Sequence, residues 1–95
     1  MRGFGQSPTN YAIETGIDKV ARFLGMDRIE LRHRNLIGRD EFPYLIPSGT
    51  TYDSGDYATV LDKALAAAPY QHIAEQRDAL RAQGLLAGIG VSTCI

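Results

Sequence analysis

The sequence predicts an α+β fold that is mostly helical, with about four helices and one C-terminal strand. Apolar residues recur at helical spacing, and glycine or proline stands at the end of each such stretch. The last residues, LLAGIGVSTCI, form an apolar and partly β-branched run that is typical of a strand. A chain of 95 residues that is 44% hydrophobic and 22% charged has the composition of a globular piece with a modest core.

The first helix is expected to begin at Ser7 and Pro8, where a hydroxyl cap precedes a proline at the first helical position. Its apolar face is predicted to consist of Ile13, Ile17, Val20, Ala21 and Leu24. Polar residues such as Glu14 are placed on the opposite side, and Gly25 is expected to end the helix in the left-handed conformation. Gly16 in the interior is expected to pack closely against another backbone, since glycine otherwise weakens a helix.

A second, short helix is predicted from the capping-box pattern DRIE that begins at Asp27, and it is expected to end at about residue 34. The basic run RHR at residues 32–34 is interpreted as complementing the dipole at the end of this helix. Residues 35–51 are rich in glycine and proline, so this segment is expected to lie as irregular chain across a surface.

Two more helices are predicted in the second half of the chain. Asp53 and Ser54 offer caps for a third helix that ends at Pro69. A fourth helix is expected from about Pro69 to Gln83, and Gly84 closes it. A single terminal strand cannot satisfy its own backbone hydrogen bonds, so the chain is interpreted as an excerpt of a larger domain.

Composition narrows the classes of function. A net charge of −1 shows no excess of positive charge that would attract nucleic acid or an anionic membrane. No apolar run approaches the ~20 residues of a membrane span. The single cysteine, Cys94, excludes an internal disulfide framework and a multi-cysteine metal site, and it fits a cytoplasmic location. Within an apolar strand it is interpreted as an inert small hydrophobe.

The loop Arg2-Gly3-Phe4-Gly5 is the candidate functional motif, and the residues alone leave two interpretations open. It is either a glycine turn that feeds a helix, or a loop that binds a ligand. In the second case, the missing Cβ atoms of the glycines let a bulky ligand lie against the backbone, whose amides donate to it. An RNA-binding interpretation is disfavoured, because Pro8 removes a donor where that motif continues as a strand. No pair of groups stands at catalytic spacing, and neither histidine has a partner at metal-ligand spacing. A non-catalytic helical interaction module therefore remains the alternative function.

Several motifs in collinear order resemble one family. The run MRGFG-x-S-P-x-x-Y-A-I-E-T-x-I-D, followed by G-M-D-x-I-E-L-R-x-R-N-L-I, resembles the molybdopterin-binding large subunit of the xanthine dehydrogenase and aldehyde oxidase family of molybdenum hydroxylases. The later stretches FPY, YDSGDY, LDKAL and GIGV are similar to segments that follow this loop in the family. The resemblance covers nearly the whole chain, so residues 1–95 are expected to form part of one molybdopterin-binding domain.

The resemblance implies roles for the loop rather than for a catalytic group. It implies that the cofactor is lined by Arg2, Gly3, Phe4, Gly5 and Gln6, mainly through backbone groups. The implied chemistry is the hydroxylation of aldehydes, purines or N-heteroaromatic compounds with oxygen from water. The glutamate base of the family lies far downstream, so no residue here is expected to be catalytic or to bind the metal. The isolated chain is expected to be inactive.

The resemblance also implies the partners. They are the rest of the large subunit and the iron–sulfur and flavin (FAD) subunits or domains, with molybdopterin and molybdenum as cofactors. Bacterial relatives commonly use the cytosine dinucleotide form of the pterin. No nucleic-acid partner is expected, whereas self-association of the isolated chain is expected from its apolar surface.

Overall fold

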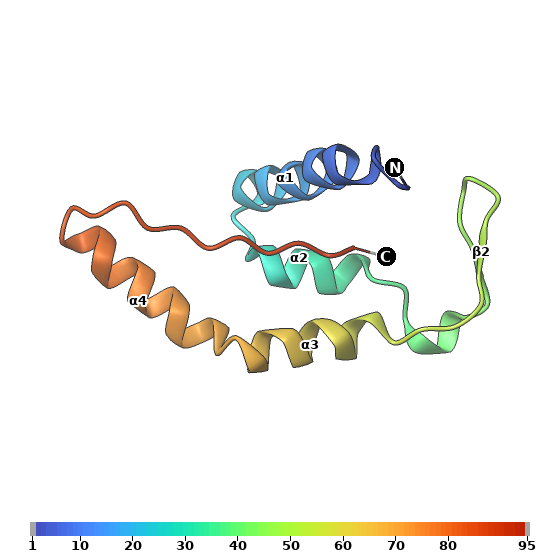
Figure 1. The fold of residues 1–95 in the computed structure, drawn as a ribbon. Coiled ribbons are helices and arrows are strands. Elements are labelled where there is room, and N and C mark those ends of the chain that lie inside the picture. The colour runs from blue at the N-terminus through green and yellow to red at the C-terminus, as the bar shows by residue number, and fades with distance from the viewer. Residues whose placement is uncertain (1, 95) are drawn as a thin grey trace. The chain divides into compact units, whose positions relative to one another are not determined.

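The computed structural model describes residues 2–94, which form two compact units. Unit 1 contains the chain up to Ile37 together with the residues from Ser92 onward, and unit 2 contains Gly38–Val91. Along the chain, the elements are α1 (Gln6–Leu24), α2 (Arg28–Asn35), a 3₁₀ turn (Arg39–Glu41), β1 (Tyr44–Leu45), β2 (Thr51–Tyr52), α3 (Tyr57–Ala67) and α4 (Tyr70–Ala82) (Figure 1). The prediction of a mostly helical α+β chain with four helices is confirmed.

Helix α1 begins earlier than the sequence predicts. Its N-cap is Gly5, with no side-chain cap, so Ser7 already lies inside the helix. The reason is a tight turn before it, in which the Gln6 N–H donates to the Gly3 carbonyl at 2.9 Å. The C-terminal end is as predicted: Gly25 has φ 64°, and the Met26 N–H returns to the Ala21 carbonyl at 2.9 Å.

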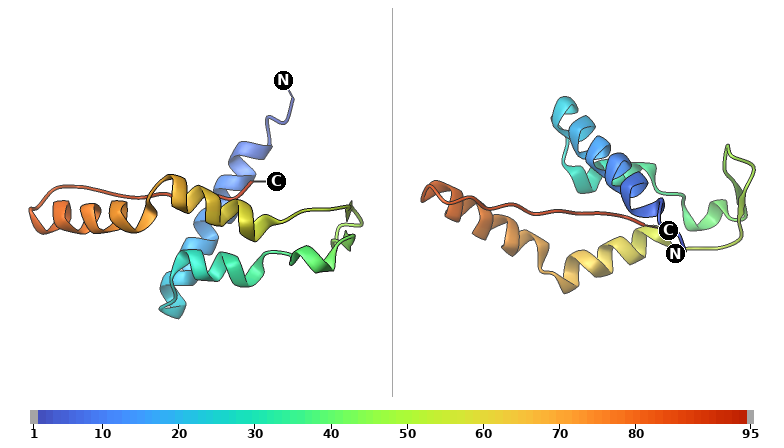
Figure 2. Two further views of the ribbon diagram at one scale, coloured as in Figure 1. Left: turned by 90° about the horizontal axis from the view of Figure 1, so that it is seen from below. Right: turned by 45° about the horizontal axis from the view of Figure 1, so that its top comes forward.

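Helix α2 begins at the predicted cap and packs against α1. The Asp27 carboxylate accepts hydrogen bonds from the backbone N–H groups of Ile29 at 2.8 Å and Glu30 at 3.1 Å. Ala21 of α1 and Ile29 of α2 are the buried apolar residues of this unit. The two helices meet across the turn at Gly25 (Figures 1 and 2).

The buried face of α1 differs from the prediction. Of the predicted apolar face only Ala21 is buried, while Ile13 and Leu24 are each 55% exposed. Glu14, which was placed on the polar side, is 7% exposed. An ion pair with α2 makes this burial possible, because a carboxylate is removed from water only together with a compensating charge. The close backbone neighbour expected for Gly16 does not come from the described residues, since no atom of theirs beyond its own helix lies within 4 Å of the position of a Cβ there.

Unit 2 contains a short hairpin that the sequence analysis missed. Strands β1 and β2 are antiparallel, with Tyr44 opposite Tyr52 and Leu45 opposite Thr51. The connecting turn contains Gly49 at φ 91°, where glycine relieves the backbone strain. Strands of two residues give almost no alternation of apolar and polar side chains, so the sequence shows only the turn residues.

Helices α3 and α4 follow one another with a bend between them (Figure 2). The cap of α3 is Asp56, whose side chain accepts from the Thr59 N–H at 3.2 Å, and not the predicted Asp53 or Ser54. Leu61 is the buried residue of α3, and Phe42 packs edge-on against Tyr57 with ring centroids 5.4 Å apart. No helix within residues 2–94 is long and apolar enough to span a membrane.

The C-terminal stretch forms no strand. Residues 85–94 run as irregular chain after α4, because no strand among the described residues offers them a ladder of backbone partners (Figure 1). The last part of this stretch belongs to unit 1, where it is bound by side chains of α1.

Candidate cofactor-binding loop

The loop from Arg2 to Gln6 is a compact turn that leads directly into α1. Gly3 has φ 63°, which favours glycine, and its carbonyl accepts the Gln6 N–H at 2.9 Å. The Gln6 side chain folds back over this turn, so a Cβ at position 3 would lie 2.7 Å from its Oε1. The backbone conformation therefore favours glycine at this position, whereas the close contact involves only the end of the flexible Gln6 side chain.

Gly5 is a different case, because the space beside it is open. Its φ of −84° suits any residue, and a Cβ there would meet no atom within 4 Å. The Gly5 carbonyl is occupied, since it accepts the Thr9 hydroxyl at 2.8 Å and the Thr9 N–H at 3.3 Å. No side chain caps the first turn of α1, but Gln6 and Thr9 donate their N–H groups to Gly3 and Gly5 and Pro8 has none, so the Ser7 N–H is the backbone donor that this turn can offer a ligand.

A hollow of about 640 Å³, open to solvent, lies against this loop. Its lining residues all belong to unit 1: Gly3, Phe4, Gly5, Gln6, Thr9, Asn10, Ile13 and Cys94. Phe4 is 79% exposed, so its ring is available to a ligand instead of packing in the core. The structure thus brings together four of the five predicted loop residues, while Arg2 is exposed beside them.

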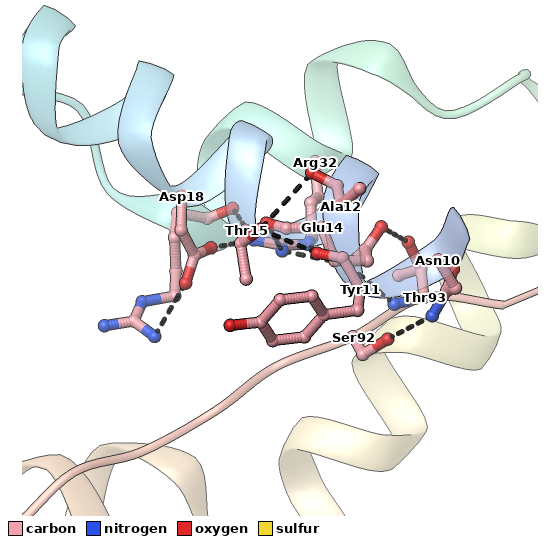
Figure 3. Close-up of polar contacts among 10 residues, drawn as sticks. Asn10, Tyr11, Ala12, Glu14, Thr15, Asp18, Arg32, Ser92 and Thr93 are labelled. Atoms are coloured by element: carbon pink, nitrogen blue, oxygen red, sulfur yellow. Dashed lines mark hydrogen bonds and ion pairs between the residues drawn. The ribbon is translucent and has the colours of Figure 1, made fainter. Parts of the chain in front are cut away.

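A buried ion pair joins α1, the helix that lines part of this hollow, to α2. Arg32 donates from Nε at 3.1 Å and from Nη2 at 2.9 Å to Glu14 Oε2, and from Nη1 to Asp18 Oδ1 at 2.8 Å (Figure 3). The Arg32 side chain is 1% exposed and the Glu14 side chain 9%. Arg32 lies in the last turn of α2, as the dipole interpretation predicts, but it also forms this buried ion pair, which the sequence analysis missed.

Glu14 also binds the C-terminal residues of unit 1. It accepts the Thr93 N–H and the Thr93 hydroxyl, each at 2.9 Å. Burial by itself raises the pKa of the Glu14 carboxyl, but the hydrogen bonds from Thr93 and Arg32 and the charge of Arg32 outweigh it and leave the pKa below its ordinary value. Burial lowers the pKa of Arg32, but its hydrogen bonds to Asp18 and Glu14 and the charges of these two carboxylates outweigh burial and leave the pKa above its ordinary value. Glu14 is thus an ionised structural group whose partners named here, Arg32 and Thr93, lie outside the Arg2–Gln6 loop.

Sequence reasoning missed the part of the hollow that lies outside the loop. Thr9, Asn10 and Ile13 line it because they follow the loop at helical spacing, a signal that the sequence does contain. Cys94 lines it as an exposed residue of irregular chain, whereas a position in an apolar strand was expected. Within residues 2–94, no three His, Cys, Asp or Glu side chains are grouped so that they could hold a metal ion.

The fold and the loop agree with a family of known proteins. Residues 1–36 match the model of the molybdopterin cofactor-binding domain. The chain belongs to the molybdenum hydroxylase family, as a segment of its molybdopterin-binding domain.

The relatives are large subunits of such enzymes. The chain is 42% identical over 86 residues to the carbon monoxide dehydrogenase large chain of Hydrogenophaga pseudoflava, covering 87% of this chain and 11% of the relative. It is 30% identical over 95 residues to the nicotine 6-hydroxylase large subunit of Paenarthrobacter nicotinovorans, covering 100% of this chain and 11% of the relative. The solved structure of reconstituted CO dehydrogenase from Oligotropha carboxidovorans matches with a TM-score of 0.73 and 36% identity, over 82% of this chain and 10% of that one. The chain thus spans about a tenth of the length of these relatives.

Proposed function

We propose that this segment forms one wall of the molybdopterin site of a molybdenum hydroxylase. The wall consists of Arg2, Gly3, Phe4, Gly5 and Gln6, and residues 1–95 together make one part of the cofactor-binding domain. The observation that carries the proposal is the open hollow against this loop, at a helix end with no side-chain cap. The matching family model, which includes the loop, supports the same assignment.

The residues present fit such a cofactor. A pterin with a phosphate tail needs hydrogen-bond donors and close approach to backbone, and this segment offers the Ser7 N–H at the helix start and two glycines in the loop. Arg2 adds a cation beside the hollow, and the Gln6 amide offers both a donor and an acceptor. When bound, the cofactor supplies the molybdenum centre at which substrate is oxidised. The cytosine dinucleotide form of the pterin is the form that we propose for this segment.

The activity that we propose for the whole protein is an oxidation that inserts water-derived oxygen into an aldehyde, a purine or an N-heteroaromatic substrate. Iron–sulfur and FAD groups on other segments or subunits would carry the electrons away. The base that activates the oxygen donor is expected elsewhere in the large subunit, so this chain alone should bind cofactor weakly and catalyse nothing. Molybdenum near one equivalent in the purified 95-residue chain would contradict this part of the proposal.

Gly5 gives the sharpest test of the wall. In the assembled enzyme, Gly5→Leu should leave α1 intact, because the position has a helical backbone and open space, yet its side chain would project into the cofactor's volume. Molybdenum and pterin content per subunit should then fall several-fold. The matched control is Ala12→Leu, an exposed position on the same helix that does not line the hollow. Unchanged cofactor content in Gly5→Leu would exclude the loop as a wall.

A second candidate, a helical interaction module without cofactor, is favoured by one observation. Helix α1 exposes large apolar side chains, among them Phe23 at 90% and Tyr11 at 72%. Sedimentation of the 95-residue chain separates the two functions. A segment that lacks its natural covering should self-associate, whereas a strictly monomeric, well-folded chain would favour the module.

A further inference from the structure

Side chains of α1 hold the C-terminal residues of unit 1, in place of a neighbouring strand. Thr93 gives both its N–H and its hydroxyl to the carboxylate of Glu14, each at 2.9 Å. One turn earlier on α1, the Asn10 amide donates to the Ser92 hydroxyl at 2.8 Å. Figure 3 shows Ser92 and Thr93 side by side along the chain, each facing its partner on the helix.

The carboxylate that receives Thr93 is also held by Arg32, through the same oxygen, Oε2, that accepts the Thr93 N–H. Arg32 donates twice to Oε2 of Glu14, and its Nη2 also donates to the Glu14 carbonyl at 3.3 Å. Asp18 fixes the far end of the same guanidinium at 2.8 Å. A planar guanidinium that is bound at both ends holds Oε2 of Glu14 in place. Thr93 is therefore received by a preformed acceptor.

This contact lies next to one wall of the hollow. Cys94 directly follows Thr93 and lines the hollow together with the loop residues Gly3 to Gln6. Ile13, which lines the hollow from α1, directly precedes Glu14. The same short stretch of α1 thus contributes to the hollow and anchors the segment that limits it.

We propose that Glu14 is a positioning residue: the Glu14–Arg32 pair holds residues 92–94 on α1, so that Cys94 forms a second wall of the hollow beside the Gly3–Gln6 loop. Glu14 acts through Thr93 and does not itself line the hollow. The inference rests on the proposed function only for the identity of the ligand that the hollow binds. The position of the wall is a property of this chain alone, so its test requires no cofactor and can fail independently.

The first experiment measures amide hydrogen exchange of the 95-residue chain by NMR. Glu14→Gln removes the charge that receives the Thr93 N–H, so exchange at Thr93 should become roughly tenfold faster or more. The matched control is Glu30→Gln, because Glu30 pairs on the surface with Arg34 and has no contact with residues 92–94. Exchange at Thr93 that is equal in both variants would overturn the proposal.

The second experiment measures the position of the wall directly. The chain has one cysteine, so a nitroxide label attached at Cys94 should broaden the amide signals of Gly3, Phe4 and Gln6. Glu14→Gln should abolish this broadening, and Glu30→Gln should preserve it. If Glu14 only stabilised the fold, Glu14→Gln would leave the broadening unchanged as long as α1 and α2 remain folded.

If Glu14→Gln unfolds unit 1, a third variant still tests whether the contact with Thr93 holds the wall. Thr93→Pro removes the N–H and the hydroxyl together and leaves the Glu14–Arg32 pair intact, in a segment whose lack of helix suits proline. It should abolish the broadening, while Thr93→Ser, which keeps both donors, should restore it. Persistent broadening in Thr93→Pro would show that another contact holds the wall, and the proposal would be wrong.

Discussion

Arg32 and Glu14 form a two-pronged ion pair across 18 positions of sequence, with both Nε and Nη2 of Arg32 directed to one carboxylate oxygen. The same guanidinium reaches Asp18 through Nη1, so one cation neutralises two carboxylates of α1. No buried side-chain nitrogen or oxygen among the described residues lacks a hydrogen-bond partner. The contact between α1 and α2 is therefore specified by polar groups as much as by Ala21 and Ile29.

Replacing Arg32 by methionine should destabilise unit 1 strongly. The methionine retains much of the volume but leaves Glu14 without its cation inside the unit, and such a loss costs about 3 kcal/mol or more. Urea unfolding followed by circular dichroism measures the change. The control is Arg34→Met on the same helix, whose partner Glu30 is exposed, and it should cost at most about 1 kcal/mol. Equal losses in the two variants would contradict a structural role for the buried pair.

The stability of the chain should depend on the ionisation of Glu14. Its pKa is lower in the folded chain than its ordinary value of 4.5, so its contribution is complete above that value and is lost as the pH falls through the folded pKa. Melting temperatures measured from pH 7 downward should therefore decline below about pH 4.5.

Other acidic groups contribute to the same decline, because hydrogen bonds and nearby cations also lower the pKa values of Asp56 and Asp78. The informative quantity is the difference between the unmodified chain and Glu14→Gln. That difference should shrink as the pH falls, since protonation removes from Glu14 the charge that glutamine already lacks. A difference that stays constant from pH 7 to pH 3 would show that the charge of Glu14 is irrelevant.

The cap of α2 should contribute measurably to stability. Asp27→Ala removes the acceptor of two backbone N–H groups and should cost about 1 kcal/mol. Asp27→Asn should recover most of the loss, because the amide oxygen also caps helices well. Asp40→Ala, at an exposed position, serves as the control for loss of one negative charge. Thermal unfolding of the three variants provides the comparison.

Replacement by alanine should change the stability in opposite directions at Gly25, the C-cap of α1, and at Gly16 inside this helix. Gly25→Ala places a Cβ on a residue with φ 64° and should cost about 1 kcal/mol. Gly16→Ala should stabilise the 95-residue chain by about 1 kcal/mol, because its backbone is helical and the surrounding space is open. A destabilising Gly16→Ala would mean that another segment approaches this position in solution, as the sequence analysis expected.

The ends of the helices were predictable where one residue decides them. Gly25 and Asp27 act locally, through a left-handed backbone and a side-chain acceptor, so the sequence alone identifies them. The start of α1 was misplaced because a turn at Gly3 brings the chain into helical conformation before the serine that resembles a cap. The terminal strand was wrong because a strand requires a partner, which periodicity cannot supply.

The site was predictable only in its local part. The Arg2–Gln6 loop stood out through its glycines and its resemblance to a family, and four of these residues line the hollow. The contribution of Cys94 and the burial of Glu14 depend on a contact between residues 79 positions apart. Hydrophobic periodicity assigns a carboxylate to the solvent side unless the compensating cation is known, and Arg32 lies on another helix.

The hydrogen bonds between Glu14 and Thr93 also affect the order in which unit 1 forms its contacts during translation. On a ribosome, α1 and α2 are complete long before residue 93 is added, so the Glu14–Arg32 pair can form while the carboxylate is still partly hydrated. All of Gly38–Val91 must be translated before the acceptor receives its last donors. Unit 1 therefore acquires its final contacts later than a unit of contiguous sequence would, and nascent chains that end before residue 92 would carry the hollow with one side missing.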